Sequence, residues 1–323
     1  SSPTFFSKIK PTLQLFKDDI KKCYSNSETF NIFKENKRIL LFLINEKFII
    51  VDKYIAKEIT TSSELSQKYY PQYFAPEIKP FKNEKWFLEN KKNENEKEGE
   101  NECIEELPDD FYESRKIGEN DEFICKLIRE DLVEDFSAYV NRKNISFNAI
   151  INQSIYETNS FLLEKQIQSE KGITLIEYAA FFGSIQIFYY LKNNKAEITP
   201  SLLIYAIHSK NAELINLLEE LLIKKTNKNL YLECFNESIK CHHNEIANYF
   251  IDNYLESNVE NSDCTLVQSL KYYNFSFLKI ERHMNESSFC HLCFFDYYLL
   301  VKAFLMVKDV LINSKIIQNI NFQ

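Results

Sequence analysis

The sequence predicts an all-α protein in which a small N-terminal helical domain precedes an α-solenoid, a row of stacked helix pairs. Residues 174–191 carry apolar side chains at the spacing of two short helices, with Gly183 where the chain must turn. Weaker copies of this pattern return further along the chain, and a single helix pair cannot bury its apolar side without neighbours. At 323 residues and 45% hydrophobic content, the chain is long and apolar enough for a sizeable core.

The first 90 residues are predicted to form the N-terminal helical domain. Residues 11–70 carry apolar residues at helical spacing. Thr60 to Glu64 matches the start of a helix with a capping box, and Pro71 is expected to end that helix. Pro76 to Pro80 is expected to cross the surface in extended form, because proline disfavours helix in the residue before it.

Residues 91–118 are predicted to be an acidic linker, because they are rich in Glu, Asn and Lys and show little periodicity. Residues 119–323 are predicted to form about six helix pairs. Small or apolar residue pairs recur in steps of 27, 32, 31 and 23 residues, where the first helix of one pair approaches the next closely. These close-packing pairs are Ala179-Ala180, Ala206-Ile207, Ser238-Ile239, Ser269-Leu270 and Leu292-Cys293, with a fainter copy at Leu127-Ile128.

Residues 174–191 resemble the ankyrin repeat in the order and spacing of the threonine, the tandem alanines, the glycine and the final leucine. With its later copies, the chain is similar to a divergent, glycine-poor ankyrin-repeat subfamily that is expanded in some anaerobic flagellate protists. The resemblance covers about residues 119–315. It implies a groove, lined by the ends of the first helices, that holds another protein. Asn is expected to replace the missing turn glycines at Asn193-Asn194, Asn211 and Asn274, because it tolerates a left-handed backbone.

In the ankyrin pattern, the two residues after each close-packing pair face the groove. Aromatic and cationic residues occupy many of these positions here, and aromatic anchors often dominate binding energy. The predicted partner-binding residues are Phe181, Phe182, His208, Lys240, Lys271, Tyr272, Phe294 and Phe295. The alternative interpretation is that Phe181 and Phe295 pack into neighbouring repeats.

The sequence predicts no enzymatic activity, no cofactor and no metal site. Cys241-His242-His243 and Cys290 to Cys293 contain metal-ligand residue types, but they lie two repeats apart in a stack where only neighbours touch. His208 could form an acid/base pair with Glu213, although a histidine at such a turn is usually a surface residue. The 4 glycines never fall at a phosphate-binding spacing.

The formal charge of −8 argues against general binding of nucleic acid, which needs a basic surface. No apolar run is long enough to span a membrane. The 8 Cys at irregular spacing suggest free thiols in the cytoplasm. The predicted function is a scaffold or adaptor for a protein partner. The alternative is a structural subunit of a permanent cytoskeletal or axonemal assembly, with a cytoskeletal location.

Overall fold

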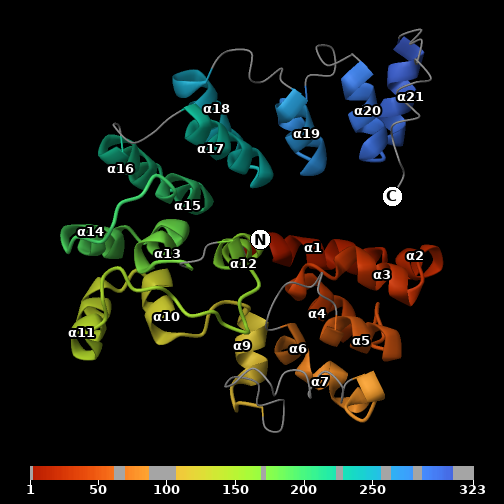
Figure 1. Cartoon of the computed structure of the whole chain (residues 1–323). Helices are drawn as coiled ribbons and strands as arrows, with labels where there is room; N and C mark the ends of the chain where they lie inside the picture. Colours follow the sequence, from red (N-terminus) through yellow and green to blue (C-terminus); the bar gives the residue numbers. More distant parts are fainter. Residues whose placement is uncertain are drawn as a thin grey trace. The chain divides into compact units, whose positions relative to one another are not determined.

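A computed structural model describes residues 3–61, 70–86, 107–168, 172–222, 228–255, 263–278 and 286–307 (Figure 1). The regular structure of these residues is helical, and they contain no β-strand, which confirms the all-α class. One isolated antiparallel bridge joins Ile150 and Thr174. Residues 62–69 and 91–106, to which parts of the predicted capping box and linker belong, lie outside the described residues.

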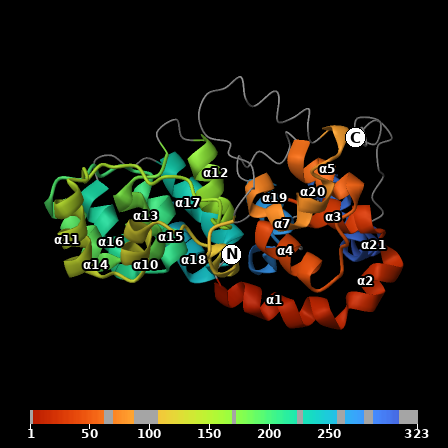
Figure 2. The same ribbon diagram turned by 90° about the horizontal axis from the view of Figure 1, so that it is seen from below.

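The chain divides into two compact units, residues 1–130 with 134–175, and residues 131–133 with 176–323. In the first unit, helices α3, α4 and α5 pack together around fully buried Phe30, Leu40 and Ile55 (Figure 2). The helices of this unit are α1 (Pro3–Leu15), α2 (Lys17–Cys23), α3 (Asn26–Phe33), α4 (Lys37–Asn45), α5 (Lys53–Thr61), α6 (Tyr70–Tyr73), α7 (Ala75–Ile78), the 3-10 helix η1 (Lys79–Phe81), α9 (Phe111–Ile117), α10 (Phe123–Arg129), α11 (Val133–Lys143) and α12 (Ser160–Gln168).

Two local predictions for the N-terminal residues are wrong. Thr60 and Thr61 belong to α5, where their hydroxyls donate to carbonyl oxygens one turn earlier at 2.8 and 2.9 Å, and the rest of the predicted capping box lies outside the described residues. Pro71 does not end a helix, because α6 continues past it to Tyr73. Pro76 and Pro80 lie in the first turns of α7 and η1. Proline fits there because the first-turn N–H groups have no helical partner to lose.

Part of the predicted linker belongs to the first unit, because residues 111–117 form α9. The guanidinium of Arg115, which is buried, donates to both carboxylate oxygens of Glu77 on α7 at 2.8 and 3.0 Å. The ammonium of Lys37 is also buried and lies 3.4 Å from the carbonyl oxygen of Glu157. These polar contacts join residues 107–175 to the N-terminal helices, and the first unit accordingly contains residues 1–130 and 134–175.

The second unit consists of helix pairs that follow one another along the chain (Figure 1). The first helices of four successive pairs, α15, α17, α19 and α20, contact one another in that order. Each of them also contacts the second helix of its own pair, which is α16, α18, η3 or α21. The helices of this unit are α13 (Leu175–Phe182), α14 (Ile185–Asn193), α15 (Leu202–Ser209), α16 (Ala212–Leu222), α17 (Lys228–Lys240), α18 (Asn244–Tyr254), α19 (Asp263–Lys271), the 3-10 helix η3 (Phe275–Phe277), α20 (Glu286–Phe294) and α21 (Tyr298–Val307).

The predicted close-packing positions are buried in this unit, with the exception of Cys293, which is exposed. Ala179, Ala206, Ser238 and Ser269 are fully buried, and each lies in the last half of a first helix. Small side chains at these positions let neighbouring first helices approach closely. Within the described part of the chain, no helix is both long and apolar enough to span a membrane.

Each first helix ends at a residue with a left-handed backbone, four positions after the start of its close-packing pair. The turn residues are Gly183, Lys210, His242, Tyr273 and Asp296, with φ of 73°, 57°, 58°, 55° and 56°. The prediction that Asn193-Asn194, Asn211 and Asn274 adopt this conformation is therefore wrong. In four of the five turns, the amide of the next residue donates to the carbonyl oxygen five residues back, which is the Schellman arrangement that closes a helix.

The residue after each of the last four turn residues binds the preceding first helix, or in one case the turn residue that follows that helix, through its side chain. The donors and carbonyl acceptors are Asn211 to Gly183 (3.4 Å), His243 to Ile207 (2.8 Å), Asn274 to Ile239 (2.9 Å) and Tyr297 to Leu270 (2.7 Å). We call these four hydrogen bonds the carbonyl ladder. They join each helix pair to the one before it through buried or half-buried polar groups.

Candidate functional site

The predicted partner-binding residues lie at the C-terminal ends of the first helices. Five of them form a connected run, in which Glu237 on α17 links His208 to Lys240. The five are Phe181, His208, Lys240, Lys271 and Tyr272. The ring centroids of Phe181 and His208 lie 4.9 Å apart, which connects α13 to α15. The ammonium of Lys240 lies 5.9 Å from the ring centroid of Tyr272, and that of Lys271 lies 5.3 Å from the same ring. The run therefore crosses α13, α15, α17 and α19.

The remaining predicted residues differ in exposure. Phe181 is only 8% exposed, and the ring of Phe182 packs on that of Tyr178 at 4.7 Å. Phe295 packs against the apolar cluster around Leu270, whereas Phe294 is 70% exposed. Phe181 and Phe295 therefore pack into the helix stack, as the alternative interpretation expected. Among the described residues, no ring contact joins Phe294 or Phe295 to Tyr272.

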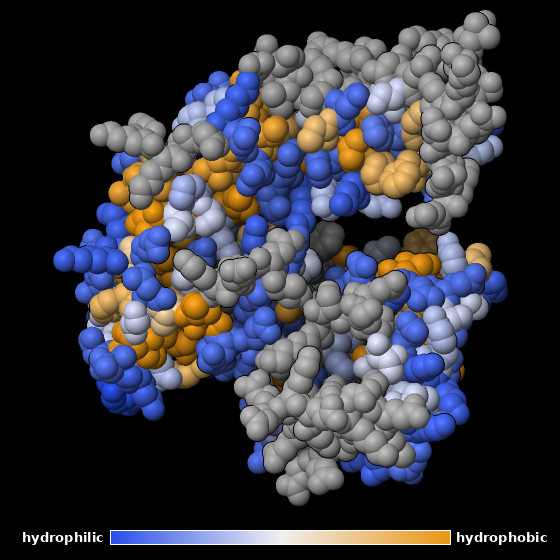
Figure 3. Space-filling model, viewed as in Figure 1, coloured by the Kyte–Doolittle hydropathy of each residue, from blue (hydrophilic) through white to orange (hydrophobic). Residues whose placement is uncertain are grey.

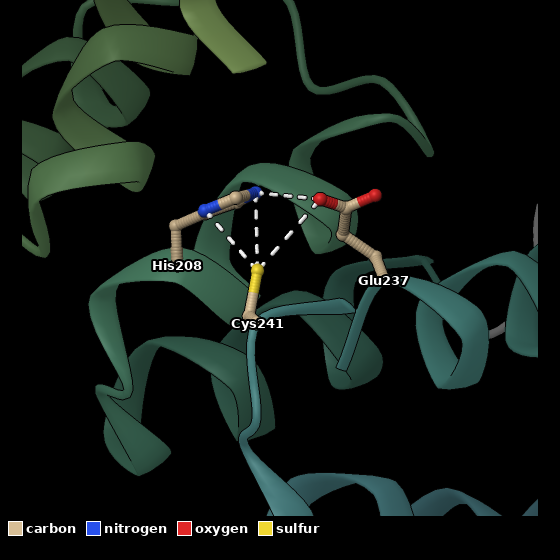
Figure 4. A group of neighbouring side chains, drawn as sticks. All are labelled: His208, Glu237 and Cys241. Carbon is tan, nitrogen blue, oxygen red and sulfur yellow. Dashed lines mark hydrogen bonds and ion pairs between the residues drawn. The ribbon is translucent and has the colours of Figure 1, made fainter. Parts of the chain in front are cut away.

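His208 lies in a cluster with Glu237 and Cys241, on the neighbouring pair (Figure 4). The imidazole Nε2 lies 3.2 Å from the Glu237 Oε1. The thiol Sγ lies 3.6 Å from Nδ1, 3.9 Å from Nε2 and 3.7 Å from Oε1. Glu237 and Cys241 are four residues apart, so they project from the same side of the end of α17. The ammonium of Lys240 lies 3.4 Å from the same carboxylate.

The protonation states follow from the shared environment. Burial lowers the pKa of His208, against the pull of Glu237, so the imidazole is neutral near pH 7. Burial works to raise the pKa of Glu237, but the hydrogen bond from His208 and the charge of Lys240 hold it below its usual value. Burial and the Glu237 carboxylate raise the pKa of Cys241 to about 12. The thiol is therefore protonated, which disfavours it as a nucleophile.

The other sequence candidates are separated by the fold. His208 does not pair with Glu213 but with Glu237, and the Glu213 carboxylate lies 3.5 Å from the hydroxyl of Tyr189. His242 Nε2 contacts the carbonyl oxygen of Tyr272 at 2.9 Å, and His243 belongs to the carbonyl ladder. Sequence reasoning missed Glu237, whose only signal was its four-residue spacing from Cys241.

The surface over these pairs is mixed in character. Figure 3 shows apolar and hydrophilic residues reaching the surface side by side over α15 to α17. Lys271 is exposed and Lys240 and Tyr272 are half-buried, so the accessible part of the run is cationic and aromatic. Such a surface can contact an acidic or aromatic segment of another molecule.

The chain has no match among protein-family models, curated proteins or solved structures.

Proposed function

We propose that this chain is a non-enzymatic scaffold or adaptor that binds another protein along the ends of its first helices. The proposal includes an ankyrin-like solenoid in residues 176–307 and the adjoining turn residue Asp131. The main supporting observation is the common register of the turns and of the carbonyl ladder. Such repetition presents equivalent positions at regular intervals, which suits an extended partner segment.

The contact order of the first helices supports the same proposal. The first helices α15, α17, α19 and α20 contact one another in that order, and a ring contact between Phe181 and His208 links α13 to α15. The Asp131 carboxylate accepts hydrogen bonds from the amides of Gln186 and Ile187 at 3.1 and 2.9 Å. That contact caps the start of α14 from a turn more than fifty residues earlier, as expected where one repeat supports the next.

The partner surface proposed here is narrower than the predicted stripe. It comprises Phe182, Lys240, Lys271, Tyr272 and Phe294, because Phe181 and Phe295 are packed and His208 is engaged by Glu237. With two lysines beside one tyrosine, it favours a partner segment that carries carboxylates, although the chain as a whole is acidic.

Site-specific photo-crosslinking tests the proposal in extract of the native cells. A photoreactive phenylalanine at Tyr272 or Phe294 should capture one partner, and unlabelled wild-type chain should compete. The variant Lys240→Glu/Lys271→Glu should not compete. Exposed Asn248 on α18 is the matched control position. Equal capture from Asn248, or competition by the double variant, would contradict the proposed surface.

A second candidate function is a structural subunit of a permanent cytoskeletal or axonemal assembly. The observation that favours it is the apolar exposure of the last described pair, where Phe294, Tyr298 and Leu299 are 70%, 70% and 77% exposed. An adaptor should be extracted from cells in mild buffer. Resistance to extraction until the filaments are dismantled would favour the lattice subunit.

A further inference from the structure

We propose that His208, Glu237 and Cys241 form a binding site for a borderline-soft divalent cation, with Zn²⁺ as the representative ion. This site goes beyond the scaffold function and does not depend on it. It also departs from the sequence prediction, which expected no metal and placed the only candidate ligands two repeats apart. The residues that meet in the structure come instead from two adjacent pairs (Figure 4).

The distances between the three ligand atoms fit one face of a tetrahedron. Bond lengths of 2.0–2.3 Å to zinc place tetrahedral N, O and S ligands about 3.4–3.6 Å from each other. Here, Nε2 lies 3.2 Å from the carboxylate oxygen and 3.9 Å from the sulfur, and the carboxylate oxygen lies 3.7 Å from the sulfur. Because the sulfur lies slightly nearer Nδ1, at 3.6 Å, than Nε2, the imidazole must also turn about its Cβ–Cγ bond before its Nε2 lone pair points at an ion held by the other two atoms.

The ligand types also select the ion. Imidazole and thiolate favour zinc and related transition metals over Mg²⁺ or Ca²⁺, and three protein ligands leave a fourth position for water. On binding, the Cys241 thiol releases its proton to solvent, and the imidazole exchanges its proton with solvent from Nε2, where it is donated to Glu237 without the ion, to Nδ1, so that the Nε2 lone pair can face the ion. The side chains of His208 and Glu237 are 13% and 15% exposed, so solvent reaches the cluster.

The carboxylate of the proposed site already has a positive charge beside it. The Lys240 ammonium lies 3.4 and 3.5 Å from the two carboxylate oxygens of Glu237, where it balances the negative charge. A divalent cation would replace it. Lys240 has a second contact available, since its ammonium lies 5.9 Å from the ring centroid of Tyr272. The ion and the ammonium therefore compete for Glu237.

The backbone holds the ligands in place without the ion. His208 is in the last turn of α15, whose end contacts α17, and the amide of Cys241 donates to the carbonyl oxygen of Glu237 at 2.9 Å, which continues the helix. The ring of Phe181 covers the imidazole from the neighbouring helix. Ligands supported by packed helix ends lose little freedom when they bind an ion.

Zinc titration of the full chain, stripped with a chelator and followed with a chromogenic zinc indicator, tests the site. We expect one zinc per chain that Cys241→Ser and Glu237→Gln each weaken at least about tenfold. Cys264→Ser, at an exposed thiol on α19, and the double variant Cys290→Ser/Cys293→Ser should keep wild-type affinity. Circular dichroism melts establish that the variants are folded. Wild-type affinity in Cys241→Ser, or loss of binding in the double variant instead, would overturn the proposal.

Two further measurements separate a metal site from a hydrogen-bonded cluster of structural importance only. Lys240→Met should raise the zinc affinity several-fold, because the competing ammonium is gone, and a structural role gives no such gain. If this variant binds no more tightly than wild type, the proposed site is wrong. Co²⁺ in place of zinc should give a thiolate-to-metal absorption band that disappears in Cys241→Ser, and a Co²⁺ complex without that band would equally refute it.

Discussion

Replacing Asn274 by Ala tests how strongly the carbonyl ladder joins neighbouring helix pairs. The Asn274 side chain is 2% exposed and donates to the carbonyl oxygen of Ile239 at 2.9 Å and to Asn244 Oδ1 at 2.8 Å. It also accepts a hydrogen bond from the Ser276 amide at 3.3 Å. Each hydrogen bond contributes about 1 kcal/mol net, so the loss of all three is expected to lower the free energy of unfolding by about 2–3 kcal/mol.

The estimate stays below the full cost of an unpaired carbonyl, because the Ile239 oxygen keeps its bond from the His242 amide at 3.1 Å. Urea unfolding of the full chain, followed by far-ultraviolet circular dichroism, measures the change. The matched control is Asn253→Ala on α18, where the exposed amide binds only the carbonyl one turn earlier. A loss in Asn274→Ala no larger than that in Asn253→Ala would refute the role of the ladder.

Three further predictions concern single positions. Burial lowers the pKa of His243 from 6.5 to about 4, so the folded state resists protonation of this imidazole. The free energy of unfolding of wild type should therefore fall by about 1–2 kcal/mol, after discounting for partial exposure, as pH falls across that interval. His243→Asn should remove this contribution in urea titrations at several pH values. Gly183→Ala should destabilise by about 1–3 kcal/mol in the same assay, because φ is 73° and the new Cβ would lie 2.9 Å from the Cβ of Ser209. Arg115→Met should cost about 2–4 kcal/mol by leaving half-buried Glu77 without its partner, and Arg115→Met/Glu77→Met should regain most of that stability in thermal unfolding.

The helix pairs of the second unit could be predicted because their signal is periodic and local. Apolar spacing placed both helices of residues 174–191, and the steps between close-packing pairs recur unchanged between the turn residues from Gly183 to Asp296. Burial of small residues such as Ala206 and Ser238 follows from the same periodicity. These features depend on residues that are close in sequence within one helix pair, so a sequence pattern is enough to predict them.

Apart from Gly183, the turn residues could not be identified from the sequence, because the closure of the helix imposes the left-handed backbone on whatever residue occupies that position. Lys210, His242 and Tyr273 all adopt it, at a cost of about 1–2 kcal/mol that the packed pair outweighs. Asn211 and Asn274 come one position later, where an amide reaches the neighbouring helix. These asparagines were predicted to be turn residues, whereas in the structure they form hydrogen bonds to the preceding pair.

The candidate metal cluster was beyond sequence reasoning for a different reason. His208 and Glu237 are 29 residues apart, and their meeting depends on the contact between α15 and α17. Glu213 is nearer along the chain but lies on the second helix of its pair. The prolines of the first unit misled in the same way, because their effect depends on whether they begin or interrupt a helix.

The carbonyl ladder has one consequence for how such a protein can change over generations. Its acceptor is a main-chain oxygen that every amino acid supplies, and its donor has been an amide, an imidazole or a phenol at successive positions. A duplicated or deleted module would therefore find a usable acceptor at the new junction without a second, compensating substitution. The number of helix pairs in such a protein can therefore change, while the side chain at each junction can be any of several hydrogen-bond donors.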